Sequence, residues 1–253
     1  MQDALNEIYQ FLVENREYNK RLQTRYYNEI LSPHTEKVER AIALLYHIAN
    51  TQSQPKIDKL ASFYQLVYSH QNSLDTFQGF LSIIDTKNKC DRNYRGLFQA
   101  LRDQSGWGNK TSALFVKSIY HLHNGDYPIN LKIWNDVPAK ITENDKLYLP
   151  VDQVIISIFK YINLRSWSFA RINKELGKYY LGSQIEVWDD LWFWGFISQV
   201  GGGSDRQMKW NPNKYWILKE SDKDSKMISK IQSKAEEFIG ILERAKKRIQ
   251  KVK

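Results

Sequence analysis

The chain has 253 residues, of which 42% are hydrophobic, so it is long enough to bury a core without disulfide bonds or a structural metal. Its single cysteine, Cys90, excludes an internal disulfide and any four-cysteine zinc or iron–sulfur site, which fits a reducing compartment. Lys and Arg outnumber Asp and Glu by 37 to 28, and the resulting net charge of +9 makes a polyanion the expected partner.

The first predicted helices lie near the N-terminus. Apolar residues recur at helical spacing over residues 4–12 and, after the start signal Ser32-Pro33, over residues 38–48. The N-terminal segment carries acidic and polar residues throughout and lacks the apolar core of a signal peptide. No stretch of the chain approaches the roughly 20 apolar residues of a membrane span. We therefore expect a cytoplasmic protein that makes no contact with a membrane.

Further helical patterns along the chain make an all-α fold class the expectation. They cover residues 57–69, 73–84, 93–104, 109–122, 152–162, 166–178 and 186–199. Only residues 208–220 and 147–151 look extended. The run Gly201-Gly202-Gly203-Ser204 predicts a flexible joint or turn.

Residues 125–149 form a long insert between two helical patterns. The segment has no consistent period and contains Pro128 and Pro138. Loops of this length in compact domains tend to be functional or disordered.

The C-terminal stretch, residues 223–253, predicts a basic amphipathic helix. From residue 226 onward its apolar residues form one helical stripe, which should dock on the body of the protein. From residue 221 onward there are ten Lys or Arg and five Asp or Glu, a net charge of +5. The outer face of this helix fits either a solvated surface or contact with a DNA backbone.

Residues 93–122 are typical of two short helices joined by a tight turn, Ser105-Gly106-Trp107-Gly108-Asn109-Lys110-Thr111. Glycines at 106 and 108 relieve the Cβ clash at positive φ and leave backbone amides facing outward, where the second helix's N-terminus can take a phosphate. The same glycine pattern also serves ordinary turns. Trp107, within the turn, should be exposed or should cover Lys110.

A second feature follows at residues 149–154, which read Leu-Pro-Val-Asp-Gln-Val. Pro150 fixes the start of a new helix, and Asp152 lies in its first turn, where the helix dipole favours an acid. Without further context, the pattern around Asp152 also fits an acid that only caps a helix. Likewise, Lys110 fits an ordinary solvated lysine on a helix.

Three segments resemble the HhH-GPD superfamily of DNA glycosylases, and they occur in the family's order. GWGNKTSALFVKSI, beginning at Gly106, resembles the helix-hairpin-helix, which has a G-x-G-x-K core in the lyase-competent members. LPVDQVI, beginning at Leu149, resembles the segment that supplies the catalytic aspartate. LVYSHQNS, beginning at Leu66, is similar to the helix end that fills the hole left by the flipped base. This resemblance spans about residues 55–165 and implies a two-lobed helical fold with a cleft between the lobes.

The resemblance implies a role for each of these residues. Lys110 would be the amine nucleophile that attacks C1′ and forms a Schiff base, and Asp152 would stabilise the positive charge that builds on the sugar. The helix dipole and partial burial both favour the neutral form of the Lys110 amine. The residues expected to contact DNA are Gly106, Trp107, Gly108, Asn109, Gln71 and Asn72.

Two departures from the family narrow the prediction. Lys110 and Asp152 are 42 positions apart, beyond the usual family spacing, and the insert over residues 125–149 accounts for the excess. That spacing is similar to the spacing in the archaeal-type 8-oxoguanine glycosylases. The cysteines that hold an iron–sulfur cluster in other branches of the family are absent from this sequence. The expected function is therefore base-excision repair of an oxidised purine, most simply 8-oxoguanine, with AP lyase activity. The expected partner is double-stranded DNA containing a damaged base, bound by a monomer that joins the nucleoid on binding.

The sequence gives less information about the residues of the base pocket and about cofactors than about the residues named above. Trp188, Trp192 and Trp194 offer aromatic faces for a flipped base, although residues at this helical spacing more often belong to a core. The five histidines do not form a metal constellation, so we expect neither a catalytic metal nor a cofactor. The resemblance alone implies a monovalent cation at the hairpin carbonyls. The alternatives are a glycosylase for another base, a non-catalytic helix-hairpin-helix DNA-binding protein, and a helical interaction protein.

Overall fold

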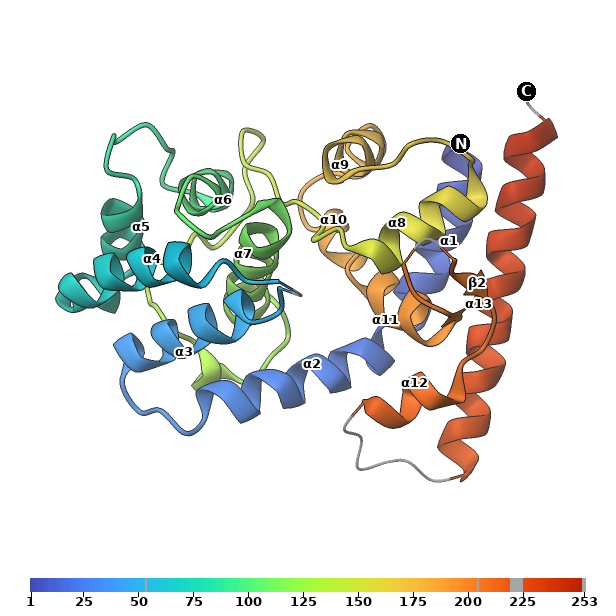
Figure 1. The fold of residues 1–253 in the computed structure, drawn as a ribbon, viewed down its shortest axis with the longest axis horizontal. Helices are drawn as coiled ribbons and strands as arrows, with labels where there is room; N and C mark the ends of the chain where they lie inside the picture. Colours follow the sequence, from blue (N-terminus) through green and yellow to red (C-terminus); the bar gives the residue numbers. More distant parts are fainter. Residues whose placement is uncertain (53, 204, 219–224, 252–253) are drawn as a thin grey trace. The chain divides into compact units, whose positions relative to one another are not determined.

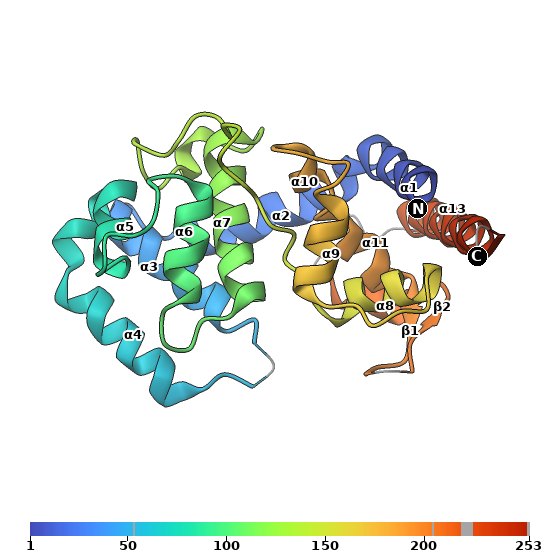
Figure 2. The ribbon, with the colours of Figure 1, turned by 90° about the horizontal axis from the view of Figure 1, so that it is seen from above.

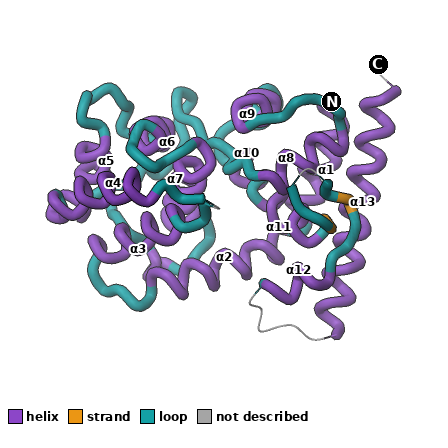
Figure 3. The backbone as a smooth tube through the Cα atoms, in the orientation of Figure 1, coloured by secondary structure: helices purple, strands orange, loops and turns teal. Residues whose placement is uncertain are grey.

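The computed structural model describes residues 1–52, 54–203, 205–218 and 225–251, and the described chain is mostly helical (Figures 1 and 3). About 65% of it is helix and 2% is strand. None of the helices in these ranges is long and apolar enough to cross a membrane.

The helices follow one another through short loops, with two 3-10 turns among them. Their bounds are α1 (Gln2–Glu14), α2 (Arg16–Leu31), α3 (Lys37–Ala49), α4 (Ile57–Ser69), η1 (Gln71–Asp75), α5 (Phe77–Ile84), α6 (Tyr94–Arg102), α7 (Asn109–Asn124), η2 (Ile129–Leu131), α8 (Gln153–Ile162), α9 (Phe169–Leu176), α10 (Gln184–Val187), α11 (Asp190–Ile197), α12 (Pro212–Ile217) and α13 (Ser225–Lys251). One antiparallel strand pair, β1 (Gln199–Val200) with β2 (Gln207–Met208), joins α11 to α12.

The chain divides into two compact units. Unit 1 consists of residues 1–22 and 151–253, and unit 2 consists of residues 23–150. The chain passes between the units twice, once within α2 and once at the bond between Pro150 and Val151.

Unit 1 is built on the packing of α1 against α13, which lie side by side in both views (Figures 1 and 2). The ring of Phe11 lies 5.3 Å from that of Phe238 and 5.1 Å from that of Trp194, centroid to centroid. A second contact joins α8 to α11, where Gly195 is essential. A Cβ at that position would lie 2.5 Å from the side chain of Ile158. These contacts fix α8, whose N-terminal end carries Asp152.

Unit 2 is built around α7, which lies beside α6 (Figure 2). The buried face of α7 includes Phe115, whose ring lies 5.8 Å from that of Phe80 on α5. Phe80 in turn stacks on Trp134, at 5.5 Å and 22°. The indole Nε1 of Trp134 donates a hydrogen bond of 2.7 Å to the carbonyl oxygen of Leu74.

The predicted helices are confirmed, with differences at their ends. The pattern over residues 73–84 is split into η1 and α5, because Thr76 adopts an extended conformation and caps α5 by accepting from the Gly79 amide. The pattern over residues 186–199 is likewise split into α10 and α11. On α13 most of the predicted apolar stripe is buried, at Ile231, Ala235, Phe238, Leu242, Ala245 and Ile249, whereas its other two members, Ile228 and Ile239, are half-buried. Residues 223, 224, 252 and 253 of the predicted C-terminal helix lie outside the described residues.

The prediction that residues 208–220 are extended is wrong for most of their length. Only Met208 belongs to a strand, and residues 212–217 form α12. The side chain of Asn211 caps this helix by accepting from the Lys214 amide, and Pro212 occupies its first turn. Residues 219 and 220 lie outside the described part of the chain, as does Ser204 of the predicted glycine joint. Residues 147–151 form no strand.

The insert over residues 125–149 is irregular, as predicted, but it is packed into unit 2. Leu131, Ile133 and Trp134 are buried. Two of its carboxylates cap neighbouring helices. Asp136 accepts from the amides of Phe77 and Gln78, and Asp145 accepts from those of Tyr94 and Arg95. The insert therefore holds the N-terminal ends of α5 and α6.

Candidate functional site

The hairpin between α6 and α7 depends on one glycine in a left-handed conformation. Gly106 has φ +83°, and a Cβ there would lie 2.9 Å from the backbone nitrogen of Leu60. Gly108 has φ −131° and open space around it, so the prediction of positive φ is wrong at this position. Gly108 is the exposed N-cap residue of α7, and its amide donates to Oγ1 of Thr111 at 3.0 Å. The amides of the first turn of α7 follow directly, at Asn109 and Lys110.

Lys110 lies in the first turn of α7 and is half-buried. Its Nζ donates a hydrogen bond of 3.2 Å to the carbonyl oxygen of Thr51, in the loop after α3. The next residue, Gln52, donates from Nε2 to the carbonyl oxygen of Gly106 at 3.2 Å. The same short loop therefore holds both the turn and the amine that follows it.

Trp107 is buried, so the prediction of an exposed side chain or a cover over Lys110 is wrong. Its ring lies 5.2 Å from that of Phe63 on α4 and 6.1 Å from that of Phe115 on α7. The side chain of Trp107 is a core group that locks the hairpin onto α4. It has no exposed face to offer to DNA, and the exposed residues of the turn are Ser105, Gly108 and Asn109.

The end of α4 is exposed over several consecutive residues. Ser69, His70, Gln71 and Asn72 are all exposed, whereas Leu74 is fully buried and anchors the segment. The imidazole Nδ1 of His70 lies 2.9 Å from the carbonyl oxygen of Leu66. Gln71 and Asn72 are thus on the surface of unit 2.

Asp152 is the N-cap of α8 rather than a residue of its first turn. Its Oδ1 accepts from the Ile155 amide at 3.1 Å, and its Oδ2 accepts from the indole Nε1 of Trp192 at 3.1 Å. The carboxylate is half-buried. Both of its oxygens have a protein donor, so its orientation relative to α8 and α11 is fixed.

The three candidate tryptophans divide into two groups. Trp188 and Trp194 are fully buried, Trp188 against Tyr180 and Trp194 against Phe11, so the structure places both in the core of unit 1. The expectation that they offer a face to a base is therefore corrected. Trp192 is half-buried, and its ring stacks on that of Phe196 at 5.1 Å and 12°.

Lys110 belongs to unit 2 and Asp152 to unit 1. Each is held by neighbours in its own unit, Lys110 by the loop after α3 and Asp152 by Trp192.

Unit 1 contains a pair of cations, Lys214 and Arg206, that was not predicted from the sequence. Nζ of Lys214, on α12, lies 5.2 Å from the centroid of the Phe196 ring, and Arg206 lies close enough for its charge to act on Lys214. Burial first, and the charge of Arg206 second, lower the pKa of the Lys214 ammonium. The signal that could have revealed this group is Asn211-Pro212, a cap followed by a first-turn proline, which indicates that Lys214 is on a helix.

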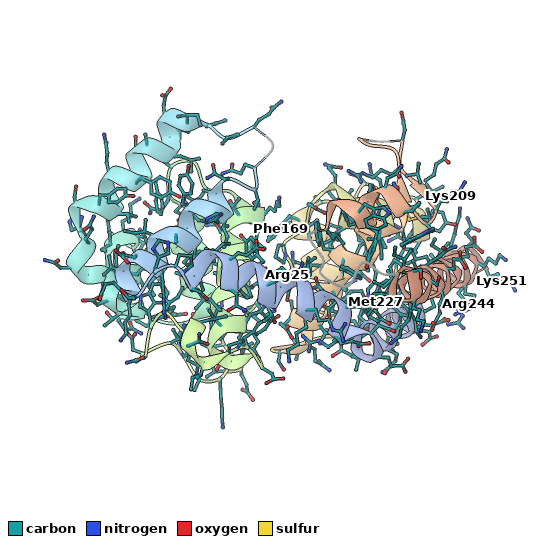
Figure 4. The ribbon with its side chains drawn as sticks, turned by 90° about the horizontal axis from the view of Figure 1, so that it is seen from below. Arg25, Phe169, Lys209, Met227, Arg244 and Lys251 are labelled. Carbon is teal, nitrogen blue, oxygen red and sulfur yellow. The ribbon has the colours of Figure 1, made fainter. Side chains whose placement is uncertain are left out.

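The outer face of α13 is basic, and part of its charge is paired within unit 1. Arg244 and Arg248 both bind Glu7 of α1, at 2.6 Å and 2.8 Å. Lys246 lies over the ring of Tyr161 at 4.6 Å. Lys247 and Lys251 are exposed, and Figure 4 shows Arg244 and Lys251 along this helix.

Among the described residues, no group of three or more His, Cys, Asp or Glu side chains could hold a metal ion. Comparison of the chain with protein-family models, with curated proteins and with solved structures finds no match.

Proposed function

We propose that the chain is a DNA glycosylase with AP lyase activity, of the HhH-GPD type, acting on an oxidised purine such as 8-oxoguanine. One observation carries the proposal. A half-buried lysine, Lys110, follows a left-handed glycine turn in the first turn of α7, and an oriented aspartate, Asp152, caps α8. The proposal requires both groups to face the same nucleotide when DNA is bound.

Lys110 supplies the nucleophile in the proposed chemistry. The neutral amine attacks C1′ of the flipped nucleotide, and the bond between C1′ and the base nitrogen breaks. The base leaves with that electron pair and takes up a proton. The attached nitrogen loses one proton, and the C1′–O4′ bond breaks, with its electron pair and a proton going to O4′. A protonated Schiff base between Nζ and C1′ results. Loss of a proton from C2′ then expels the 3′ phosphate by β-elimination.

Asp152 stabilises the positive charge that develops on the sugar as the base leaves. Its two hydrogen bonds, from the Ile155 amide and Trp192 Nε1, hold the carboxylate before substrate arrives. Preorganisation of this kind avoids the cost of reorienting the group during the reaction.

The expected contacts to DNA lie at the exposed parts of unit 2. The first-turn amides of α7, together with Gly108 and Asn109, suit a backbone phosphate. Gln71 and Asn72, which are exposed and follow the end of α4, suit the space left by the flipped base. The net charge of +9 favours binding to double-stranded DNA at low salt.

Borohydride trapping on a duplex that contains 8-oxoguanine tests the proposal. The wild-type chain should form a covalent adduct, and Lys110→Gln should form none. Lys110→Arg keeps the positive charge and a donor towards the Thr51 carbonyl, so it should bind the duplex but give no adduct. Lys140→Gln, which removes an exposed lysine of the insert, serves as the matched control and should trap like the wild type.

A wild-type chain that forms no adduct and releases no base from a panel of lesion duplexes would contradict the enzyme proposal. Release of another base from the panel would instead identify that base, rather than an oxidised purine, as the substrate.

The second candidate is a helix-hairpin-helix protein that binds DNA without catalysis. Burial of Trp188 and Trp194 favours it, because it leaves Trp192 as the one half-buried ring of the three. This candidate predicts salt-sensitive binding that is the same for lesion and undamaged duplexes.

A further inference from the structure

An aromatic stack in unit 1 ends in a pair of cations. Trp192 and Phe196, both half-buried on α11, lie parallel at 5.1 Å and 12°. Trp192 binds Asp152 at one end of the stack. At the other end, the ammonium of Lys214 lies 5.2 Å from the centroid of the Phe196 ring.

The two cations are held by one buried polar frame. Gln199 is fully buried, and its Nε2 donates to the carbonyl oxygen of Val154 at 3.0 Å. Its Oε1 accepts from Nη1 of Arg206 at 3.2 Å, and its backbone carbonyl accepts from Nδ2 of Asn211 at 3.0 Å. Asn211 caps α12, the helix that carries Lys214. The Arg206 guanidinium is therefore anchored to Gln199, and the helix that carries Lys214 is anchored to the same residue through Asn211.

Among the described residues, neither cation is paired with a carboxylate. Nζ of Lys214 and Nε of Arg206 are buried and have no hydrogen-bond partner in that part of the chain. Burial and the neighbouring charge of Arg206 both lower the pKa of Lys214, and no carboxylate of the described ranges contributes in the opposite direction. Two like charges in a partly desolvated place are unfavourable unless an anion joins them. The arrangement thus suits a ligand that brings negative charge.

We propose that Lys214 and Arg206 bind a phosphate group at the edge of the Trp192–Phe196 stack, and that this phosphate belongs to a DNA strand. A guanidinium suits phosphate through paired N–H donors, and an ammonium adds a point charge. The neighbouring rings give an unstacked base of the same strand a surface on which to lie. The choice of DNA as the source of the phosphate rests on the proposed function. Phosphate binding at Lys214 and Arg206 does not itself depend on strand cleavage.

Binding of undamaged DNA tests the site without any catalytic step. Fluorescence anisotropy with a labelled oligonucleotide should show that Arg206→Gln and Lys214→Met each weaken binding about tenfold at low salt, and each lower the salt slope by about one. Lys160→Met removes an exposed lysine of α8, in the same unit, and is the matched control. It should change the affinity by less than threefold.

A second measurement follows the wild-type chain, and a variant is needed only to assign one resonance. Lysine Cε resonances, with Lys214 assigned through Lys214→Arg, report the pKa of its ammonium. Addition of the oligonucleotide should raise that pKa towards the ordinary lysine value, because a bound phosphate stabilises the charged form. Equal concentrations of chloride should leave it unchanged.

Two results would overturn the proposal. One is an unchanged Lys214 pKa on addition of DNA, with site variants that bind like Lys160→Met. The other is a response to inorganic phosphate or a nucleoside monophosphate but not to DNA, which would assign the site to a small phosphate ligand. Failure of borohydride trapping alone would contradict the glycosylase chemistry and leave the phosphate site standing.

Discussion

Trp192 and Asp152, 40 positions apart in the chain, are joined by a hydrogen bond of 3.1 Å from the indole Nε1 to the carboxylate Oδ2. The ring that supplies the donor is itself fixed by its stack on Phe196. Trp192 is therefore a positioning residue, which acts on the proposed reaction through the orientation of the Asp152 carboxylate.

Substitution of Trp192 by Phe should slow base excision about tenfold while lesion-duplex affinity stays within threefold, because it removes the donor to Asp152 but retains a ring against Phe196. Single-turnover excision and anisotropy separate the two effects. Trp210→Phe, at a half-buried tryptophan of the same unit, is the matched control. Equal losses in both variants would show that the effect is general destabilisation.

Asp152 has two roles that substitutions can separate. Asp152→Ser keeps an oxygen that can accept from the Ile155 amide, so it should fold with a free energy of unfolding within about 0.5 kcal/mol of the wild type. Asp152→Ala removes the cap and should cost about 1 kcal/mol more. Both should lose excision, because neither retains the negative charge. Urea titrations and trapping yields measure the two quantities. Full activity in Asp152→Ser would confine Asp152 to capping.

Asp145 should be the main stabilising residue of the insert. The carboxylate is buried and accepts from the amides of Tyr94, Arg95 and Lys146. Asp145→Ala leaves these donors without an acceptor and should lower the free energy of unfolding by about 1–3 kcal/mol. Hydrogen exchange of the α6 amides should accelerate accordingly. Glu143→Ala, at an exposed residue of the same insert, should leave the exchange rates unchanged. Similar exchange in both variants would contradict a structural role for the insert.

Asp190 should make the stability of unit 1 depend on pH. Its carboxylate is buried and accepts from Asn19 at 2.6 Å and from Arg16 at 3.3 Å. Burial raises its pKa to about 8 from 3.8, and the Asn19 hydrogen bond and the Arg16 charge oppose that rise. The folded chain thus holds a proton that the unfolded chain has already released above about pH 4.

The contribution of Asp190 to the free energy of unfolding should therefore be complete below pH 3.8 and should decline as the pH rises to about 8. The slope for one proton is about 1.4 kcal/mol per pH unit. Asp190→Asn keeps the size of the side chain and removes its titration, so its stability should vary less over this range. Urea titrations from pH 5 to 8 compare the two chains. Parallel profiles would rule out titration of Asp190 in this window.

The parts of the fold that sequence patterns could predict are those with local causes. The apolar stripe of α13 is visible because each buried residue recurs at helical spacing, and Pro150 with Asp152 marks the start of α8. Burial of Trp107 was not predictable in this way, because its partner Phe63 lies 44 positions earlier in the chain, on α4. The hydrogen bond from Trp192 to Asp152 was not predictable either, because no local sequence pattern indicates which indole faces the carboxylate.

The contact between α1 and α13 has a consequence for the order in which the protein is made. Arg244 binds Glu7 across 237 positions, and residues 23–150 in between form the other unit. A ribosome releases unit 2 as one continuous segment, which can fold as soon as it emerges. The apolar face of α1 emerges before that segment but must wait for α13, synthesised more than 200 residues later, to be covered. During that interval the apolar face of a newly made α1 lacks its native partner on α13.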